Sequence, residues 1–277
     1  MAIPGKYNTL SIIKIVDFGV YLDGGELGEI LLPMKWVPEG CKPDDEIEVF
    51  IYYDSEDRVI ATTMKPYAQV GEFALLKAKA VNEIGAFLDW GLEKDLLVPY
   101  REQNAKMVEG RSYLVYIYAD PQGGRIAASA RLERFLSKET ANYQPWEEVD
   151  LILWRTTDIG YMAVVNNQHE GLLYSSEVFV DLERGQHIKG YVMKVREDGK
   201  IDLSLQKPGY EKIDGYAERL LALLKENEGF LELNDKSPAE DIYDVCGMSK
   251  KNFKKSIGAL YKQKRIQIED TGIRLIQ

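Results

Sequence analysis

The sequence predicts a multidomain protein, with three small β-barrels in tandem and a small α+β domain at the C-terminus. A short motif with a central glycine occurs three times, and its glycines at 19, 85 and 160 lie 66 and then 75 residues apart. A unit that recurs at such spacing indicates repeated domains. Each copy is rich in β-branched and aromatic residues between turn residues. After residue 209 the apolar spacing becomes helical.

The first copy, residues 1–66, is predicted to form five strands. They are Leu10–Val16, Val20–Asp23, Glu29–Leu32, Glu46–Tyr53 and Val59–Thr63. Five short strands in a chain of this length suit a five-stranded barrel of the OB type, which commonly binds oligonucleotides. The second and third copies are expected at residues 67–138 and 145–208. The central glycine is expected to allow a bulge or a close backbone approach, which would bring Phe18 and Tyr21 to one face.

The three copies share more than the glycine motif. The motif itself occurs as Asp17-Phe18-Gly19-Val20-Tyr21-Leu22, Glu83-Ile84-Gly85-Ala86-Phe87-Leu88 and Asp158-Ile159-Gly160-Tyr161-Met162-Ala163. Apolar triplets follow as Ile30-Leu31-Leu32, Leu96-Leu97-Val98 and Leu172-Leu173-Tyr174. Each copy ends in a turn with a basic residue and a last strand that begins near Arg58, Arg125 or Lys200.

Residues 210–277 are predicted to form a winged helix-turn-helix. Residues 216–225 have helical apolar spacing, and Pro238 lies near the start of a second helix. Ser249 is expected to cap a third helix whose apolar stripe is Phe253, Ile257 and Leu260. Two short strands, 265–269 and 273–276, complete the order helix, helix, turn, helix, hairpin.

Composition limits the classes of protein to which the chain could belong. No segment approaches the roughly 20 apolar residues of a membrane span, and the N-terminus lacks an apolar signal-peptide core. A cytoplasmic location and no membrane partner are therefore expected. The net charge of −10 argues against a nucleic-acid partner. The charge is uneven, however, because residues 1–66 carry −6 and residues 139–209 carry −5, whereas residues 67–138 carry +1 and residues 210–277 are neutral.

The three repeats resemble the ribosomal S1 domain, an OB-fold module that binds RNA. Its pattern is an aromatic-Gly-small-aromatic strand, then Glu-Gly-apolar-apolar-His, then Gly-basic-apolar-x-apolar-Ser. The third copy matches the later parts best, with Glu170-Gly171-Leu172-Leu173-Tyr174-Ser175 and Gly199-Lys200-Ile201-Asp202-Leu203-Ser204. Three such domains before a winged helix resemble the conserved virulence factor B family of bacterial RNA-binding regulators. The resemblance covers essentially the whole chain.

The resemblance implies which residues contact RNA. The stacking positions of the family fall on Phe18 and Tyr21, on Ile84 and Phe87, and on Ile159 and Met162. Its late acid-to-basic pair falls on Asp54 and Arg58 and on Asp120 and Arg125. In the third copy only the basic residue, Lys200, is kept, and Arg196 stands in place of the acid. The His position of the family holds Pro33, Pro99 and Tyr174. Only the first copy keeps both stacking aromatics, and it is also the most acidic copy. Further expected RNA contacts are Tyr100, Arg101, Arg131, Tyr161 and Tyr174.

Two alternatives compete with RNA contact at these positions. The aromatic side chains could pack in barrel cores or at domain junctions, where aromatics supply much of the buried area. The basic side chains could be solvated surface charge. The first two copies are the ones in which contact with bases is expected.

The predicted third helix carries a basic face. Lys250, Lys251, Lys254 and Lys255 recur at helical spacing, opposite the apolar stripe. Phosphate contact at the helix-turn-helix is the functional interpretation, and a solvated helix face is the alternative. Asn252 and Gln263 are the only nearby amides, so backbone contact is expected rather than base-specific readout of DNA.

Catalysis has little support in the sequence. The two histidines, His169 and His187, lie in one copy without a nucleophile motif, and no phosphate-binding glycine loop occurs. No catalytic residue, metal or cofactor is expected. The predicted function is binding of single-stranded RNA and post-transcriptional regulation of gene expression. The alternatives are a DNA-binding transcription regulator that acts through the winged helix, and a scaffold whose acidic barrels bind proteins at the ribosome.

Overall fold

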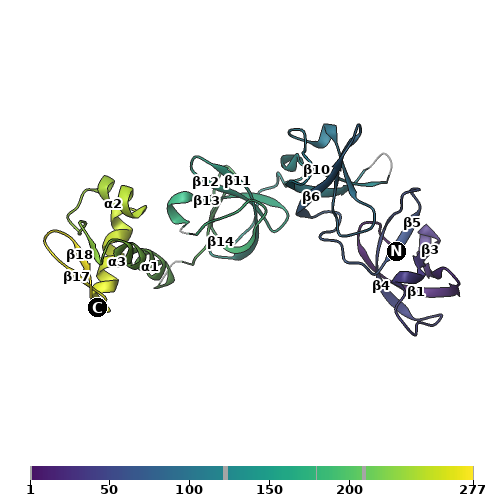
Figure 1. The fold of residues 1–277 in the computed structure, drawn as a ribbon, viewed down its shortest axis with the longest axis horizontal. Helices are drawn as coiled ribbons and strands as arrows, with labels where there is room; N and C mark the ends of the chain where they lie inside the picture. Colours follow the sequence, from purple (N-terminus) through teal and green to yellow (C-terminus); the bar gives the residue numbers. More distant parts are fainter. Residues whose placement is uncertain (1, 121–123, 179, 208–209, 277) are drawn as a thin grey trace. The chain divides into compact units, whose positions relative to one another are not determined.

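The computed structural model describes residues 2–120, 124–178, 180–207 and 210–276, and shows three five-stranded barrels followed by a winged-helix domain (Figure 1). Barrel 1 contains β1 (Tyr7–Val16), β2 (Gly19–Asp23), β3 (Glu29–Pro33), β4 (Glu46–Tyr53) and β5 (Val59–Thr62). It closes in the order β1-β2-β3-β5-β4, with β3 and β5 parallel and β4 returning to β1. This order is that of an OB barrel, so the predicted fold class is confirmed.

Barrels 2 and 3 repeat this plan. Barrel 2 contains β6 (Phe73–Val81), β7 (Gly85–Leu88), β8 (Leu96–Pro99), β9 (Ser112–Ala119) and β10 (Ile126–Ser129). Its strands follow the order β10-β9-β6-β7-β8, and the end strands β8 and β10 contact each other. Barrel 3 contains β11 (Glu148–Thr157), β12 (Gly160–Val165), β13 (His169–Tyr174), β14 (His187–Val195) and β15 (Ile201–Ser204). It closes like barrel 1.

The repeated glycine is required by a close approach of two strands. A Cβ at Gly19, Gly85 or Gly160 would lie 2.2, 2.3 or 2.0 Å from a carbonyl oxygen of the adjacent third strand. The prediction for this glycine was either a bulge or a close backbone approach, and the close approach is what the structure shows. The bulges lie instead in the first strand of each barrel, where the register shifts after Ile12 and after its counterparts in β6 and β11.

Strand β4 is buried on both faces. Val49 and Ile51 point into the core of barrel 1, as the two-residue period of a strand requires. Phe50 and Tyr52 alternate with them, yet both are also buried, because they belong to the core cluster that fills barrel 2. Barrel 1 therefore contributes side chains to the core of its neighbour.

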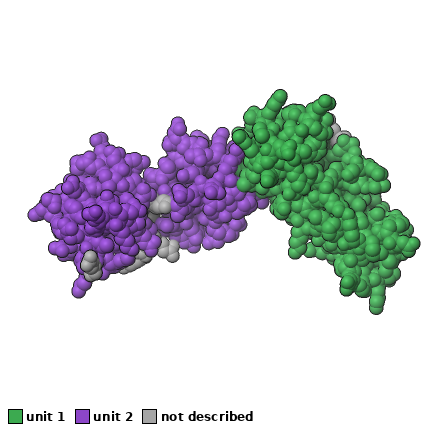
Figure 2. Space-filling view, viewed as in Figure 1, with its two compact units in different colours: residues 1–136 green, residues 137–277 purple. Residues whose placement is uncertain are grey.

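The junction of barrels 1 and 2 is aromatic. The Phe50 and Trp90 ring centroids lie 5.5 Å apart with the rings nearly perpendicular, a favourable edge-to-face arrangement. Trp90 also donates a hydrogen bond from Nε1 to the carbonyl oxygen of Ala68, 2.7 Å away. The Phe50–Trp90 contact joins the two barrels, and the hydrogen bond to Ala68 holds the Trp90 ring in place. Residues 1–136 accordingly form one compact unit, and residues 137–277 form another (Figure 2).

The C-terminal domain has the predicted winged-helix order. Its helices are α1 (Tyr210–Glu226), α2 (Ala239–Cys246) and α3 (Lys250–Lys262), and its strands are β16 (Phe230–Leu231), β17 (Ile266–Ile268) and β18 (Ile273–Leu275). The Ser249 side chain caps α3 by accepting a hydrogen bond from the Asn252 N–H, as predicted. Phe253, Ile257 and Leu260 are buried. The short β16, which was not predicted, pairs with β18.

The expected boundary between barrel 3 and the winged helix includes residues 208–209, which lie outside the described residues. Within the described part of the chain, no helix is long and apolar enough to span a membrane.

Candidate nucleic-acid interface

Each barrel exposes an apolar side chain at the turn between its first two strands. Phe18, Ile84 and Ile159, which precede the three repeated glycines, each leave 59% of their surface exposed. A single exposed apolar residue is ordinary on a protein surface. An exposed apolar side chain at the equivalent turn of all three barrels indicates that each barrel presents the same kind of surface there. Only Phe18, in barrel 1, is aromatic.

Barrel 1 carries an aromatic patch, formed by Phe18, Tyr21 and Lys14. The Phe18 and Tyr21 ring centroids lie 6.3 Å apart at an interplanar angle of 85°. Lys14 Nζ lies 4.6 Å from the centroid of the Tyr21 ring, within cation–π range. The two aromatic residues singled out in the sequence are therefore neighbours on one surface, where a base could stack.

Lys14 was not predicted as a site residue, although the sequence contains a signal for it. Lys14 precedes Tyr21 by seven residues, and the two are paired across strands β1 and β2. In barrel 3 the same pairing joins Arg155 to Met162. A basic residue therefore stands seven positions before the second stacking position in two of the three copies, although the Arg155 guanidinium lies over the Trp154 ring, 4.5 Å from its centroid.

Arg58 is engaged within its own turn. Its guanidinium binds the Asp54 carboxylate at 2.7 Å and Glu56 at 2.9 Å. Asp54 also accepts hydrogen bonds from the backbone N–H groups of Glu56 and Arg58. Partial burial works against the ionised Asp54, but the hydrogen bonds from Arg58 hold the pKa of this carboxyl below its ordinary value. This network fixes the β4–β5 turn, so Arg58 stabilises a turn whatever else it contacts.

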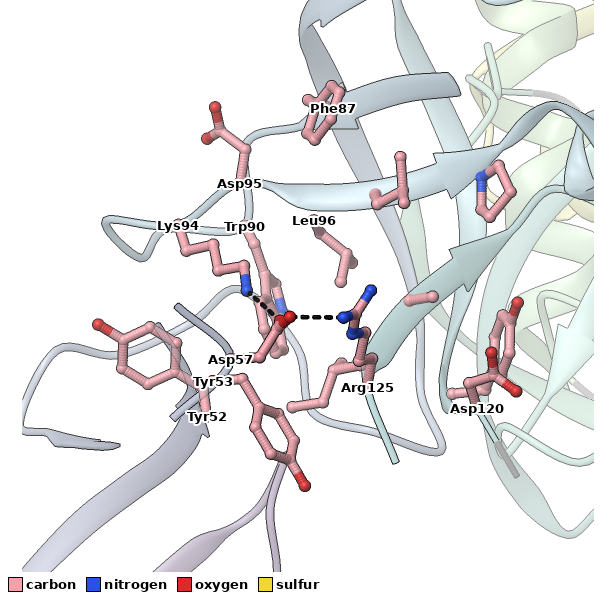
Figure 3. Close-up of a pocket in the computed structure, with 15 residues that line it drawn as sticks. Tyr52, Tyr53, Asp57, Phe87, Trp90, Lys94, Asp95, Leu96, Asp120 and Arg125 are labelled. Carbon is pink, nitrogen blue, oxygen red and sulfur yellow. Dashed lines mark hydrogen bonds and ion pairs between the residues drawn. The ribbon is translucent and has the colours of Figure 1, made fainter. Parts of the chain in front are cut away.

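A cleft of about 240 Å³ lies between barrels 1 and 2, and it contains two of the predicted residues, Phe87 and Arg125 (Figure 3). Arg125 Nη2 lies 2.6 Å from a carboxylate oxygen of Asp57. Lys94 Nζ lies 3.4 Å from the other oxygen of the same carboxylate. Asp57 of barrel 1 thus bridges two cations of barrel 2, and neither Asp57 nor Lys94 was predicted.

The remaining predicted residues of barrel 2 lie outside the lining of this cleft. Tyr100 follows β8, and its hydroxyl donates a hydrogen bond to the Asn82 carbonyl oxygen at 2.6 Å. Arg101 is the next residue and is exposed, and Arg131 is exposed beyond the end of β10. These three residues lie in two segments separated by β9 and β10.

In barrel 3 the predicted tyrosines are held by neighbouring groups. Tyr161 packs against the barrel core. The Tyr174 hydroxyl donates to the buried Asp202 carboxylate at 3.2 Å and accepts a hydrogen bond from Arg196. Hydrogen bonding to Asp202 raises the pKa of the Arg196 guanidinium above its ordinary value. Asp202 and Arg196 were not predicted, although an acid within the apolar strand Ile201-Asp202-Leu203 is a recognisable signal.

Lys200 is exposed and pairs with Asp198 at 3.1 Å. His169, on β13, lies beside Tyr143, with Nδ1 and the Tyr143 hydroxyl 3.0 Å apart. Burial lowers the pKa of His169 below its ordinary value, partly offset by Glu139.

The lowered pKa of His169 predicts an acid-sensitive barrel 3. The unfolded chain binds a proton at His169 more readily than the folded chain does, so stability is lost as the pH falls below about 6.5 and through the lower folded-state pKa. Urea unfolding at a series of pH values, followed by the fluorescence of Trp146 and Trp154, measures this loss. His169→Gln should remove the part of the pH dependence that lies in this window. An unchanged dependence in that variant would assign it to other groups.

The lysines of α3 form the most concentrated basic surface among the described elements. Lys251, Lys254 and Lys255 are exposed, while Lys250 is half-buried with its Nζ 3.4 Å from the Lys236 carbonyl oxygen. No residue of α3 is acidic. The predicted basic face is therefore present on the side of the helix away from its buried stripe.

Helix α2 has the opposite charge. Glu240, Asp241 and Asp244 are exposed on it, together with Tyr243 and Val245. In a DNA-bound helix-turn-helix, the helix before the recognition helix crosses the phosphate backbone. An acidic α2 opposes that placement, because it would set carboxylates against phosphates.

Comparison with known proteins agrees with this architecture. Residues 4–64 match the S1 domain family, which coincides with barrel 1. Residues 218–275 match the CvfB-like winged helix domain family, which coincides with most of the last domain. The OB barrel of the S1 domain supports nucleic-acid binding as the general function. Both matched families are binding domains rather than known enzymes.

Relatives resemble the chain along almost its whole length. Protein YitL of Bacillus subtilis is 28% identical, over 96% of this chain and 92% of YitL. Conserved virulence factor B of Staphylococcus aureus strain N315 is 27% identical, over 99% of this chain and 94% of that protein. The crystal structure of a multidomain protein with nucleic acid binding domains from Streptococcus pneumoniae is 25% identical, over 99% and 98% of the two chains, with a TM-score of 0.42. The two family matches and the two relatives confirm the resemblance to the conserved virulence factor B family, with an S1 domain at residues 4–64 and a CvfB-like winged helix domain at residues 218–275.

Proposed function

We propose that the protein binds single-stranded RNA in the bacterial cytoplasm and regulates gene expression after transcription. The observation that carries the proposal is the aromatic patch of barrel 1, which lies on the domain that matches the S1 family. The exposed Phe18 ring and the half-buried Tyr21 ring offer a face for an unpaired base. Lys14, which also pairs with Glu29 at 2.5 Å, offers a charge for the phosphate.

The charges of the winged-helix domain favour binding of single-stranded RNA over binding of duplex DNA. Its basic α3 can contact phosphates, whereas the acidic α2 opposes the backbone contact that duplex binding requires. A flexible strand can follow α3 without lying against α2. Several weak contacts along one RNA then add up, since tethering raises the effective concentration of each further contact.

Removing both rings of the aromatic patch should weaken RNA binding. We expect Phe18→Ala combined with Tyr21→Ala to reduce the affinity for single-stranded RNA about tenfold or more, because stacking contributes roughly 1 to 3 kcal/mol per base. Fluorescence anisotropy with a labelled oligouridylate of about 16 nucleotides, a length within the range bound by OB folds, measures this change.

Tyr243→Ala provides the matched control. Tyr243 is an exposed aromatic residue like Phe18, but it lies on the acidic α2, so its loss should leave the affinity unchanged. Equal affinities of the wild type and the Phe18/Tyr21 variant would remove the stacking claim. Tighter binding to duplex DNA than to single-stranded RNA would favour a transcription regulator instead. Crosslinking in cells and sequencing of the bound RNA would identify the regulated transcripts.

A further inference from the structure

The cleft between barrels 1 and 2 has an apolar floor and a charged mouth. The buried side chains of Tyr52, Trp90 and Leu96 line its interior. At the mouth, Arg125 leaves 67% of its side chain exposed, and Asp57 leaves 41% exposed. Asp95, which pairs with Lys79 at 3.0 Å, and Asp120 also line the cleft. The bridge that Asp57 makes between Lys94 and Arg125 crosses the centre of the view in Figure 3.

A single nucleotide has an apolar part and a charged part, as the cleft does. Its base is a planar ring with apolar faces, and its phosphate is an anion attached to one side. A volume of about 240 Å³ is below the roughly 300 to 1,000 Å³ of sites for drug-sized ligands, so the cleft suits one planar ring. The half-buried rings of Tyr53 and Phe87, from β4 and β7, lie at its sides.

Asp57 occupies the place where a phosphate would be expected. Its carboxylate lies between a lysine and an arginine, the arrangement in which Lys and Arg side chains hold a phosphate. The β4–β5 turn that carries it is fixed by Asp54 and Arg58, and Asp57 itself has a left-handed backbone with φ of 60°. Both ion pairs are partly exposed, so they contribute little stability and can be exchanged for another anion.

We propose that this cleft binds one unstacked nucleotide of a single-stranded RNA. The base enters beside Tyr53 and Phe87, and the phosphate replaces the Asp57 carboxylate between Lys94 and Arg125. Asp57 is then a built-in competitor that occupies the two cations when RNA is absent. The inference rests on the proposed RNA binding, and it adds a subsite that belongs to neither barrel alone.

A substitution at Asp57 tests the competition. Asp57→Asn in the full chain should tighten binding of the labelled oligouridylate by about two- to fivefold, the range that corresponds to an exposed ion pair. Asp44→Asn is the matched control, because Asp44 is exposed in another turn of barrel 1 and also has a positive φ, of 72°. Asparagine tolerates this conformation at both positions, and both variants change the net charge equally. Asp44→Asn should leave the affinity unchanged.

Removing the two cations should have the opposite effect. Lys94→Gln combined with Arg125→Gln should weaken binding and flatten the log-log salt dependence by about 0.7, the amount for one phosphate on a single strand. RNA that contains 4-thiouridine should crosslink to peptides with Tyr53 or Phe87. Equal affinities of the Asp57 and Asp44 variants, or crosslinks found only outside the cleft, would overturn the proposal.

Two further outcomes separate the possible failures. Loss of binding in the Phe18/Tyr21 variant, with no response to the cleft variants, would overturn the subsite and leave RNA binding intact. A wild-type protein that binds no RNA would overturn both. Free uridine monophosphate that protects the cleft from crosslinking, while Asp57→Asn leaves RNA affinity unchanged, would assign the cleft to a free nucleotide.

Discussion

Replacing Gly160 with alanine is expected to lower the free energy of unfolding of barrel 3 by about 3 kcal/mol or more. The new Cβ would lie 2.0 Å from the Leu173 carbonyl oxygen and 3.0 Å from the Ser175 nitrogen. Both are backbone atoms, so no side-chain rotation can relieve the contact, and β12 would have to separate from β13. Urea unfolding followed by the fluorescence of Trp146 and Trp154 measures the loss.

Gly199→Ala is the control for this prediction. Gly199 lies in the β14–β15 turn of the same barrel, with φ of +78°, and a Cβ at this position would meet no atom within 4 Å beyond its chain neighbours. Its replacement should cost only about 1 kcal/mol, the cost of a left-handed backbone. Equal losses in the two variants would show that the close approach of the strands is not what requires glycine at 160.

The threefold glycine motif predicted the fold because the requirement is local. Each glycine sits where one strand crosses the backbone of the next, and strand pairing within a barrel involves segments that are close in the sequence. The strands predicted for barrel 1 accordingly differ from the observed ones by at most three residues at any end. The two-residue strand β16 was too short to produce any periodic pattern.

The junction of barrels 1 and 2 could not be predicted in the same way. Asp57 and Arg125 are brought together by packing between barrels, and no local spacing relates them. A weaker signal was present in β4, where Phe50 and Tyr52 occupy positions that a barrel with one solvated face would give to polar residues. Apolar residues on both faces of a strand indicate that a second surface covers it.

In the candidate site, too, contacts between neighbouring strands were predictable from the sequence and contacts between distant segments were not. The contact between Phe18 and Tyr21 follows from a turn of two strands, and the sequence anticipated it. The acid-to-basic pair of the family anticipated the contact of Arg58 with Asp54. The contacts of Arg125 with Asp57 and of Tyr174 with Asp202 did not follow from the motifs. Those side chains are engaged by Asp54, Asp57 and Asp202, so a basic or aromatic residue type alone does not tell whether its polar group is available to RNA.

Replacing three lysines of α3 should strongly weaken RNA binding. Lys251, Lys254 and Lys255 are exposed on a helix without acidic residues, so each can neutralise one phosphate. For Lys251→Gln, Lys254→Gln and Lys255→Gln combined, we expect the log-log salt slope to fall by about 2 and the affinity to drop about tenfold or more. Anisotropy titrations at several salt concentrations measure both quantities.

The fold of the winged helix should survive these substitutions, because the Ser249 cap and the buried Phe253 are untouched. Lys42→Gln, Lys106→Gln and Lys225→Gln combined form the matched control, since these lysines are exposed elsewhere in the chain and the variant has the same net charge. An equal loss of affinity in both triple variants would show that α3 acts only through the total charge of the protein. A loss confined to the α3 variant would place phosphate contact on this helix, because long-range charge effects are common to both.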